Sequence, residues 1–292
     1  MRQRVPTAAD VTILIPTLGR EVLRECVAAI EAGSLWPACL IVVDQGSTPA
    51  VRALLNDVRA RSFDTRWVPS TTIGKSAGLN RGFGLASTRF VAIVDDDCLV
   101  ADDWLERMAD RLRRDPGVIV TGRVEAGRGE VNLALSTSRE PAVQRRPRLQ
   151  FDRLVGGNMG LSLEVFEKVG GFDEHLSVRN AEDPEYAYRA LRAGVPIVYA
   201  PDVAVWHLGW RGADERAEQY RRYAISHGGF YGKYLRRGDL FIALRAAVHL
   251  VRALRRWMGG VVRREPDLAR NGRAYVTGLL PGIVAGWRRR AS

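Results

Sequence analysis

The sequence has little cysteine or histidine and no long apolar segment. Its 292 residues include 3 cysteines and 4 histidines. Cys26, Cys39 and Cys98 are odd in number and lack metal-ligand spacing, which indicates a reduced, cytosolic compartment. No run of about 18 uncharged apolar residues is present, so no membrane-spanning helix is predicted. The segment Met1 to Asp10 carries arginines without an apolar core, which argues against a secretory signal. We therefore expect a globular cytoplasmic protein.

Positive charge is concentrated near the C-terminal end. The formal net charge is +11, yet residues 240–292 alone hold eleven arginines and two acids. Only +2 is left for the first 239 residues. The basic character therefore belongs to a C-terminal extension, and it says little about the rest of the chain.

The first half alternates short β-rich runs with helical patterns, which predicts an α/β fold with a mostly parallel central sheet. Strands are expected at 11–15, 40–43, 65–68, 90–94 and 118–121, and helices at 21–32, 51–61, 76–86 and 102–113. Residues 123–150 read as a loop or irregular insertion, and 197–199 and 203–206 as two further strands. In such sheets the ligand site lies beyond the carboxyl ends of the strands.

Three consecutive aspartates, Asp95, Asp96 and Asp97, follow the apolar run 90–94. Like charges at one strand end repel each other unless a cation lies among them. Carboxylate oxygens suit a hard ion such as Mg²⁺ or Mn²⁺. The alternative is a solvated acidic turn before the helix that begins near Asp102. The predicted position of the aspartates, on the same sheet edge as Asp44, favours the metal.

Two other segments are expected on this edge. Asp44 ends a buried strand, where its carboxylate can bind a nucleobase or ribose, or can instead cap the next turn. Residues 74–82 form a glycine-rich entry to a helix and suit close approach of a phosphate beside Lys75 or Arg81. Their spacing fits neither a Walker A motif nor a dinucleotide fingerprint.

Later residues offer a base and a further metal ligand. Glu182 and Asp183 open a helix, where an acid can act as a general base or simply favour the helix dipole. His207 ends the apolar run 203–206 and is either an imidazole ligand to the same metal or a hydrogen-bonded core histidine.

Taken in chain order, these segments resemble the family 2 glycosyltransferases, inverting enzymes with the GT-A fold. The similarity runs from about Val11 to His207. The matching segments are Ile15-Pro16-Thr17, Val43-Asp44-Gln45-Gly46-Ser47, Gly74 to Gly82, Asp95-Asp96-Asp97, Gly156-Gly157-Asn158, Gly170-Gly171-Phe172-Asp173, Glu182-Asp183 and Trp206-His207.

The resemblance implies transfer of a sugar from a nucleoside-diphosphate sugar to a hydroxyl of a glycan, lipid-linked glycan or natural product. It implies Asp183, beside Glu182, as the catalytic base, and Asp97, Asp95 and His207 as ligands of Mg²⁺ or Mn²⁺. The donor-binding residues it implies are Pro16, Thr17, Asp44, Lys75, Asn80, Asp95, Asp96 and Asn158. Residues 1–122 would then bind the donor, 123–238 would bind the acceptor and carry the base, and 239–292 would form a basic amphipathic helical extension.

The sequence departs from the family pattern at two places. Gln45 stands where the family often has a second aspartate, and Gly78-Leu79-Asn80 replaces its usual Ala-Arg-Asn. Lys75 or Arg81 is the candidate to substitute for the missing arginine.

The C-terminal extension reads as a basic amphipathic helix. Arg245, His249, Arg252 and Arg256 fall on one helical face. The apolar Phe241, Leu244, Val248, Val251, Leu254 and Met258 fall on the other, and Trp287 with Arg288-Arg289-Arg290 adds a second basic element.

This basic amphipathic pattern predicts a peripheral protein on an anionic membrane surface, at the inner face of the cell membrane. The alternative is an apolar face packed on the domain with the arginines in water. Nucleic acid is not expected, because no recognisable binding module accompanies the charge.

Two rival functions remain at this stage. A sugar-phosphate nucleotidyltransferase would carry a glycine-rich basic loop directly after the first strand, and Thr17 to Arg20 supplies little of it. A catalytically inactive membrane- or nucleic-acid-binding module would show no turnover and no metal-dependent nucleotide binding.

Overall fold

The computed structural model describes residues 5–128, 135–208 and 213–289. The chain forms two compact units built from interleaved segments. The sheet unit comprises Met1–Arg146, Arg153–Phe172 and Arg189–Trp210. The helical unit comprises Pro147–Asp152, Asp173–Tyr188 and Arg211–Ser292.

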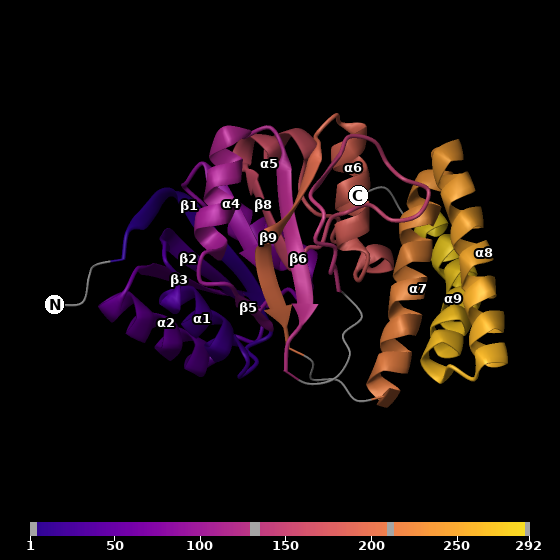
Figure 1. The fold of residues 1–292 in the computed structure, drawn as a ribbon, viewed down its shortest axis with the longest axis horizontal. Helices are drawn as coiled ribbons and strands as arrows, with labels where there is room; N and C mark the ends of the chain where they lie inside the picture. The colour runs from indigo at the N-terminus through magenta and orange to yellow at the C-terminus, as the bar shows by residue number, and fades with distance from the viewer. Residues whose placement is uncertain (1–4, 129–134, 209–212, 290–292) are drawn as a thin grey trace. The chain divides into compact units, whose positions relative to one another are not determined.

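The sheet unit is built on a mixed sheet, with nine strands in the part of the chain that the structure describes (Figure 1). The strands are β1 (Thr7–Thr17), β2 (Trp36–Asp44), β3 (Asp64–Pro69), β4 (Phe90–Val94), β5 (Cys98–Val100), β6 (Ile119–Ala126), β7 (Ala142–Gln144), β8 (Asn158–Ser162) and β9 (Ile197–His207). Their order is β3-β2-β1-β4-β8-β6-β9-β5, and β7 also pairs with β9. Pairing is parallel from β3 through β4 and antiparallel between β4 and β8. The parallel half confirms the expected βα alternation.

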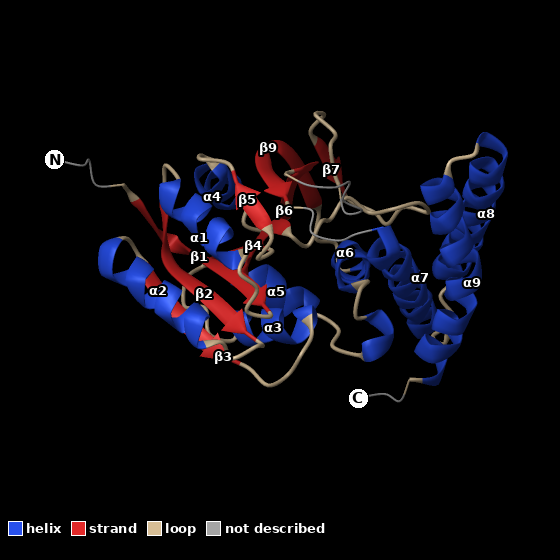
Figure 2. Ribbon diagram, turned by 90° about the horizontal axis from the view of Figure 1, so that it is seen from below, coloured by secondary structure: helices blue, strands red, loops and turns tan. Residues whose placement is uncertain are grey.

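Helices cover both faces of this sheet (Figure 2). The helices are α1 (Leu23–Ala32), α2 (Pro49–Arg61), α3 (Lys75–Phe83), α4 (Trp104–Arg114) and α5 (Leu163–Val169). On one face, α1, α2 and α4 share a single apolar core with Ile13 and Ile15 of β1. Leu14 points to the other face, where it packs so closely against Gly82 of α3 that a Cβ there would overlap it. Because both faces are covered, the central strands are apolar throughout.

Two expectations for the second half are corrected. Residues 123–150 are not simply a loop, because β6 continues to Ala126 and β7 adds a short strand; residues 129–134 lie outside the described part. The two strands expected at 197–199 and 203–206 form one strand, β9, with a register shift opposite Gly122 and Arg123. Pro201 lies within this shift, and proline has no N–H to donate to a ladder, which explains the bulge.

The helical unit contains η1 (Leu176–Val178), the start of α6 (Glu182–Arg192), α7 (Ala213–Leu235), α8 (Leu240–Arg263) and α9 (Pro266–Arg288). Its core combines Val178 and Ala181 with apolar and aromatic residues of the three long helices, among them Phe230, Ile242 and Leu279. None of the described helices is both long and apolar enough to cross a membrane. The C-terminal helices are therefore part of the same core as the segment that leads into α6.

The orientation of α8 differs from the expectation. Arg245 and His249, expected on an exposed basic face, are only 1% and 4% exposed. Arg245 forms an ion pair with the equally buried Asp152, with Nη1 2.7 Å from Oδ2. Burial lowers the pKa of His249 to about 2, so that its ring is neutral at pH 7. The burial of Arg245 contradicts the alternative in which all the arginines of this helix lie in water, and the predicted membrane contact stays a prediction.

Helices α7 and α9 pack through small residues. Gly278, Gly282 and Gly286 recur at every fourth position of α9, and a Cβ on Gly282 would overlap the carbonyl oxygen of Ile225 in α7. Close approach of two helix backbones requires such positions to lack a side chain.

We expect Gly282→Ala to destabilise the protein by about 1–3 kcal/mol, because overpacking outweighs the better helix propensity of alanine. Gly259→Ala in α8 is the matched control. No atom lies within 4 Å of a Cβ at Gly259, so we expect a gain of about 0.5–1 kcal/mol there. Urea unfolding measures both changes, and an unaltered midpoint for Gly282→Ala would contradict the close packing.

Candidate functional site

The candidate site lies at the carboxyl ends of the parallel strands in the sheet unit. Thr17 and Asp44 are register partners at the ends of β1 and β2, and β4 ends next to β1, directly before Asp95. The loops after these three strands therefore start from one edge, as expected for an α/β sheet.

Asp96 and Asp97 share an arginine that directly follows the β1 turn. The Arg20 guanidinium donates to both Asp96 oxygens, and its Nη2 lies 3.0 Å from Oδ2 of Asp97. The Thr17 hydroxyl donates to Oδ2 of Asp96 at 2.6 Å. Burial raises the pKa of Asp96, and the bonds from Arg20 and Thr17 only partly offset that shift. The two aspartates are thus fixed at their strand end and are not a freely solvated acidic turn.

Asp95 pairs with the glycine-rich loop. Lys75, the first residue of α3, places Nζ 2.7 Å from Oδ1 of Asp95. The Gln45 side chain holds the preceding residue, with Nε2 donating to Gly74 O at 2.7 Å and Oε1 accepting from Gly74 N at 3.1 Å. Gly74 has φ +148°, a conformation open to glycine. The amide of Gln45 therefore fixes the loop that delivers Lys75 to the acidic edge.

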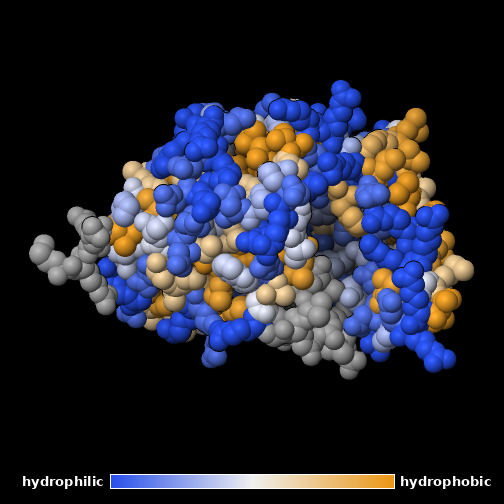
Figure 3. Space-filling model, viewed as in Figure 1, coloured by the Kyte–Doolittle hydropathy of each residue, from blue (hydrophilic) through white to orange (hydrophobic). Residues whose placement is uncertain are grey.

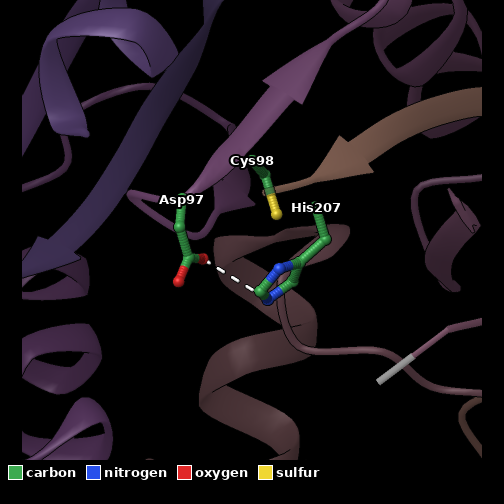
Figure 4. Close-up of side chains that lie close together, drawn as sticks. All are labelled: Asp97, Cys98 and His207. Carbon is green, nitrogen blue, oxygen red and sulfur yellow. Dashed lines mark ion pairs between the residues drawn. The ribbon is translucent and has the colours of Figure 1, made fainter. Parts of the chain in front are cut away.

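Asp97, Cys98 and His207 form the candidate metal centre (Figure 4). One candidate ligand atom from each lies within 4.8 Å of the others, and Nε2 of His207 is 3.4 Å from Oδ1 of Asp97. Two ligand atoms bound about 2.1 Å from one ion lie roughly 3.0–3.4 Å apart. His207 Nδ1 lies 3.2 Å from the carbonyl oxygen of Leu208, and Nε2 is the ring nitrogen that faces Asp97. Asp97 and His207 therefore fit a divalent ion.

The thiol of Cys98 does not suit this ion. Burial raises its pKa well above the ordinary value, and the charges of Asp95 and Asp97 add to the effect. A protonated thiol is a poor ligand, and hard ions prefer oxygen. Asp95, the other predicted ligand, lies with Lys75 and not in the group of three. Its role as a ligand stays a prediction.

Three predicted donor-binding residues are engaged within the sheet unit. Asp44 is fully buried and accepts bonds from the backbone N–H groups of Gly46 and Thr48 and from Nε1 of Trp67. Asn80 bonds both backbone groups of Phe172.

Asn158 is also fully buried, and its side chain bonds Trp104 Nε1 and the carbonyl oxygens of Arg123 and Val203. Asp44, Asn80 and Asn158 thus fix the loops that frame the edge. Direct contact of any of them with a donor stays a prediction, as it does for Pro16.

The predicted base belongs to the helical unit. Glu182 and Asp183 open α6, where Glu182 is buried at 7% and Asp183 is partly exposed. The same helix buries Glu185, whose Oε1 accepts from Lys233 Nζ at 2.5 Å and from the Tyr234 hydroxyl at 2.7 Å. Of the two candidate acids, the more accessible one is Asp183.

A second ion cluster fixes the segment before α6. Asp173 Oδ2 accepts from Lys233 at 2.8 Å and from Arg289 at 2.5 Å. Burial alone would raise the pKa of Asp173, but the bonds from Arg289 and Lys233 outweigh it and lower the pKa well below its ordinary value.

Comparison with known proteins identifies the family of this chain. The family model of glycosyl transferase family 2 matches residues 12–170, more than half of the chain. The chain belongs to glycosyl transferase family 2. The match includes the β1, β2 and β4 ends and Asn158, and it stops before Glu182, Asp183 and His207.

Curated relatives of this family 2 chain are glycosyltransferases. The pre-mycofactocin glycosyltransferase of Mycobacterium tuberculosis is 27% identical over 78% of this chain and 47% of its own length. Glycosyltransferase AglE of Haloferax volcanii is 25% identical over 69% and 67%. A putative polypeptide N-acetylgalactosaminyltransferase 13 of Drosophila melanogaster is 26% identical over 58% and 35%. The chain spans about a third to two thirds of the length of these relatives.

Solved structures share the GT-A fold with this family 2 chain. The mannosyltransferase PcManGT of Pyrobaculum calidifontis, in complex with GDP-Man and Mn²⁺, has a TM-score of 0.59 and 19% identity, over 95% of this chain and 85% of its own. TarS of S. aureus (residues 1–349) with UDP-GlcNAc has a TM-score of 0.57 and 15% identity, over 92% and 90%. The expected α/β GT-A architecture with a C-terminal helical region is confirmed.

Sequence reasoning missed two residues of this family 2 site. Arg20 was considered only as part of a nucleotidyltransferase loop, although its place directly after the β1 turn puts it on the same edge as the aspartates. Gln45 appeared only as a departure from the family pattern, yet its amide makes a paired contact with Gly74 that a carboxylate lacks the N–H to form.

Proposed function

We propose that this chain is a metal-dependent inverting glycosyltransferase that moves a sugar from a nucleoside-diphosphate sugar to an acceptor hydroxyl. The observation that carries the proposal is the fixed pair Asp97 and His207, with Oδ1 and Nε2 3.4 Å apart at the edge where β1 and β4 end. The neighbours' complexes with GDP-Man and UDP-GlcNAc support a nucleotide-sugar donor.

In this proposal Asp97 and His207 hold Mg²⁺ or Mn²⁺, with Asp95 as a further candidate ligand. When bound, such an ion supplies positive charge to the leaving diphosphate. Arg20 and Lys75 bring two more cations to the same edge, so the chain itself contributes positive charge near a diphosphate. Asp96 is held in place by Arg20 and Thr17, and its proposed role is to contact the ribose of the donor. Pro16, Asp44, Asn80 and Asn158 shape the donor loops.

Asp183 is the proposed general base. It takes the proton of the acceptor hydroxyl while that oxygen bonds to the anomeric carbon and the bond from this carbon to the diphosphate breaks. One displacement inverts the anomeric centre, so no covalent nucleophile is needed. Donor binding is thus assigned to residues 1–122, acceptor binding and the base to 123–238, and Asn158 and His207 join the donor residues from the later segment. The acceptor is a hydroxyl of a glycan, lipid-linked glycan or natural product.

A screen of nucleotide-sugars tests this proposal. We expect one donor to raise the melting temperature in Mg²⁺ or Mn²⁺, and the shift to vanish with a chelator, because the metal and diphosphate bind together. Incubation of that donor with candidate acceptors should then release the nucleoside diphosphate and give a product heavier by one sugar. Release of inorganic diphosphate from a sugar phosphate and a nucleoside triphosphate would instead identify a nucleotidyltransferase.

A further inference from the structure

Helix α8 turns a row of apolar side chains to solvent. Leu240, Leu244, Val251, Leu254, Met258 and Val261 are between 38% and 83% exposed, and we call them the α8 stripe. They recur at intervals of three, four or seven residues, with the exposed Ala247 between, so they share one helix face. The row runs for most of the 24-residue helix.

The other face of α8 is already occupied. Ile242, Arg245, His249 and Ala253 are at most 4% exposed and belong to the interior of the helical unit. The stripe therefore cannot turn inward unless the buried ion pair of Arg245 with Asp152 is broken, which would leave a buried charge without its partner. The stripe can therefore be buried only by a surface other than the interior of the helical unit.

The exposed charged side chains beside the stripe are all arginines. Between residues 236 and 264, all of them described, Arg236, Arg237, Arg255, Arg263 and Arg264 are exposed. Asp239, an acid in this span, caps α8 through Ile242 N and binds the Tyr188 hydroxyl. The next acids, Glu265 and Asp267, lie beyond the end of α8. Figure 3 shows hydrophobic and hydrophilic residues adjacent to one another over this helix.

We propose that the α8 stripe is a docking surface for an anionic lipid bilayer. An exposed apolar row with arginines at both ends matches the headgroup boundary, where the apolar side chains enter the acyl region and the guanidinium groups meet lipid phosphates. A second copy of this chain is the poorer occupant, because pairing two stripes in either direction brings arginine-rich surfaces together. This surface is independent of the proposed transfer reaction.

The docked helix lies flat on the bilayer. A helix of 24 residues is about 36 Å long, so both arginine-rich ends can reach the headgroups of one leaflet. Anionic lipid faces the cytosol in most cells, which agrees with the expected cytoplasmic inner-face location.

Vesicle sedimentation tests the proposal with the whole chain. We expect binding to vesicles of phosphatidylcholine and phosphatidylglycerol, weaker binding to phosphatidylcholine alone, and loss of binding as salt is raised. The double variant Leu244→Ser with Met258→Ser should partition at least about tenfold more weakly, because two apolar side chains no longer enter the lipid. Both side chains are exposed, so the melting temperature should stay near that of the parent.

Leu176→Ser is the matched control, since Leu176 is 74% exposed and lies outside α8, in η1. Its partitioning should equal that of the parent. Equal partitioning of the double variant and the parent would overturn the proposal. It would also fail if the parent were a dimer by analytical ultracentrifugation and the double variant a monomer. Removal of all residues after Gly238 is unsuitable as a test, because α8 and α9 supply Ile242 and Leu279 to the core of the helical unit.

Discussion

Replacement of Asp183 by asparagine is expected to lower kcat for sugar transfer by at least about a hundredfold, the lower range for loss of a general base. The amide keeps the size of the carboxylate but cannot take up the proton of the acceptor hydroxyl. Binding of the donor, measured by calorimetry with the nucleoside diphosphate and metal, should change little, because the predicted donor residues lie in the sheet unit and Asp183 in the helical unit.

Glu182→Gln is the matched control, as it changes the neighbouring acid in the same helical turn. Glu182 is buried, whereas Asp183 is partly exposed, so we expect the larger loss at Asp183. A near-normal kcat for Asp183→Asn would exclude it as the base. A large loss only in Glu182→Gln would move the role to Glu182.

Asp97→Asn is expected to weaken metal-dependent binding of a nucleoside diphosphate by at least about a hundredfold. The substitution keeps the shape of the side chain but replaces a charged ligand oxygen, and it places an amide next to His207 Nε2. Calorimetric titration of Mn²⁺ into protein with GDP or UDP measures the change without any need for turnover. Binding that is unchanged from the parent would exclude Asp97 as a ligand.

Asp95→Asn separates the two proposed roles of the acidic cluster. Its carboxylate pairs with Lys75 and lies outside the group formed by Asp97, Cys98 and His207. We therefore expect a smaller loss of metal affinity than in Asp97→Asn. Equal losses in both variants would show that Asp95 is a direct ligand.

Most strands and helices of the first half were predictable because they are short and local in pattern, and most are followed by glycine, proline or aspartate. The short strand β5 was not predicted. The run 90–94 is apolar at every position, as expected of a strand covered on both faces. The second half was harder, because its structure depends on distant partners. β9 is one strand because β6 pairs with it on both sides of a bulge that contains Pro201, while β7 pairs with its first part and β5 with its last part.

The site was predictable where residue type alone points to chemistry and unpredictable where geometry decides. Three adjacent aspartates indicated a cation, and the structure brings Asp97 to His207 as the resemblance implied. The arginine that clamps Asp96 has no local signal beyond its place after a turn. Arg245 was predicted but placed wrongly. Helical periodicity put it on an exposed basic face, whereas the structure buries it in an ion pair with Asp152, 93 residues away in the chain.

The ion pair between Asp173 and Arg289 has a consequence for how the protein folds while it is being synthesised. The two residues are 116 positions apart, and a ribosome adding roughly 5–20 residues per second needs about 6–23 s to cover that interval. Ala181, one position before the α6 acids, shares a core with Leu279 of α9. A nascent chain that ends before α9 therefore contains all the predicted donor-binding residues but still lacks the helix whose Leu279 shares a core with Ala181, next to the proposed base.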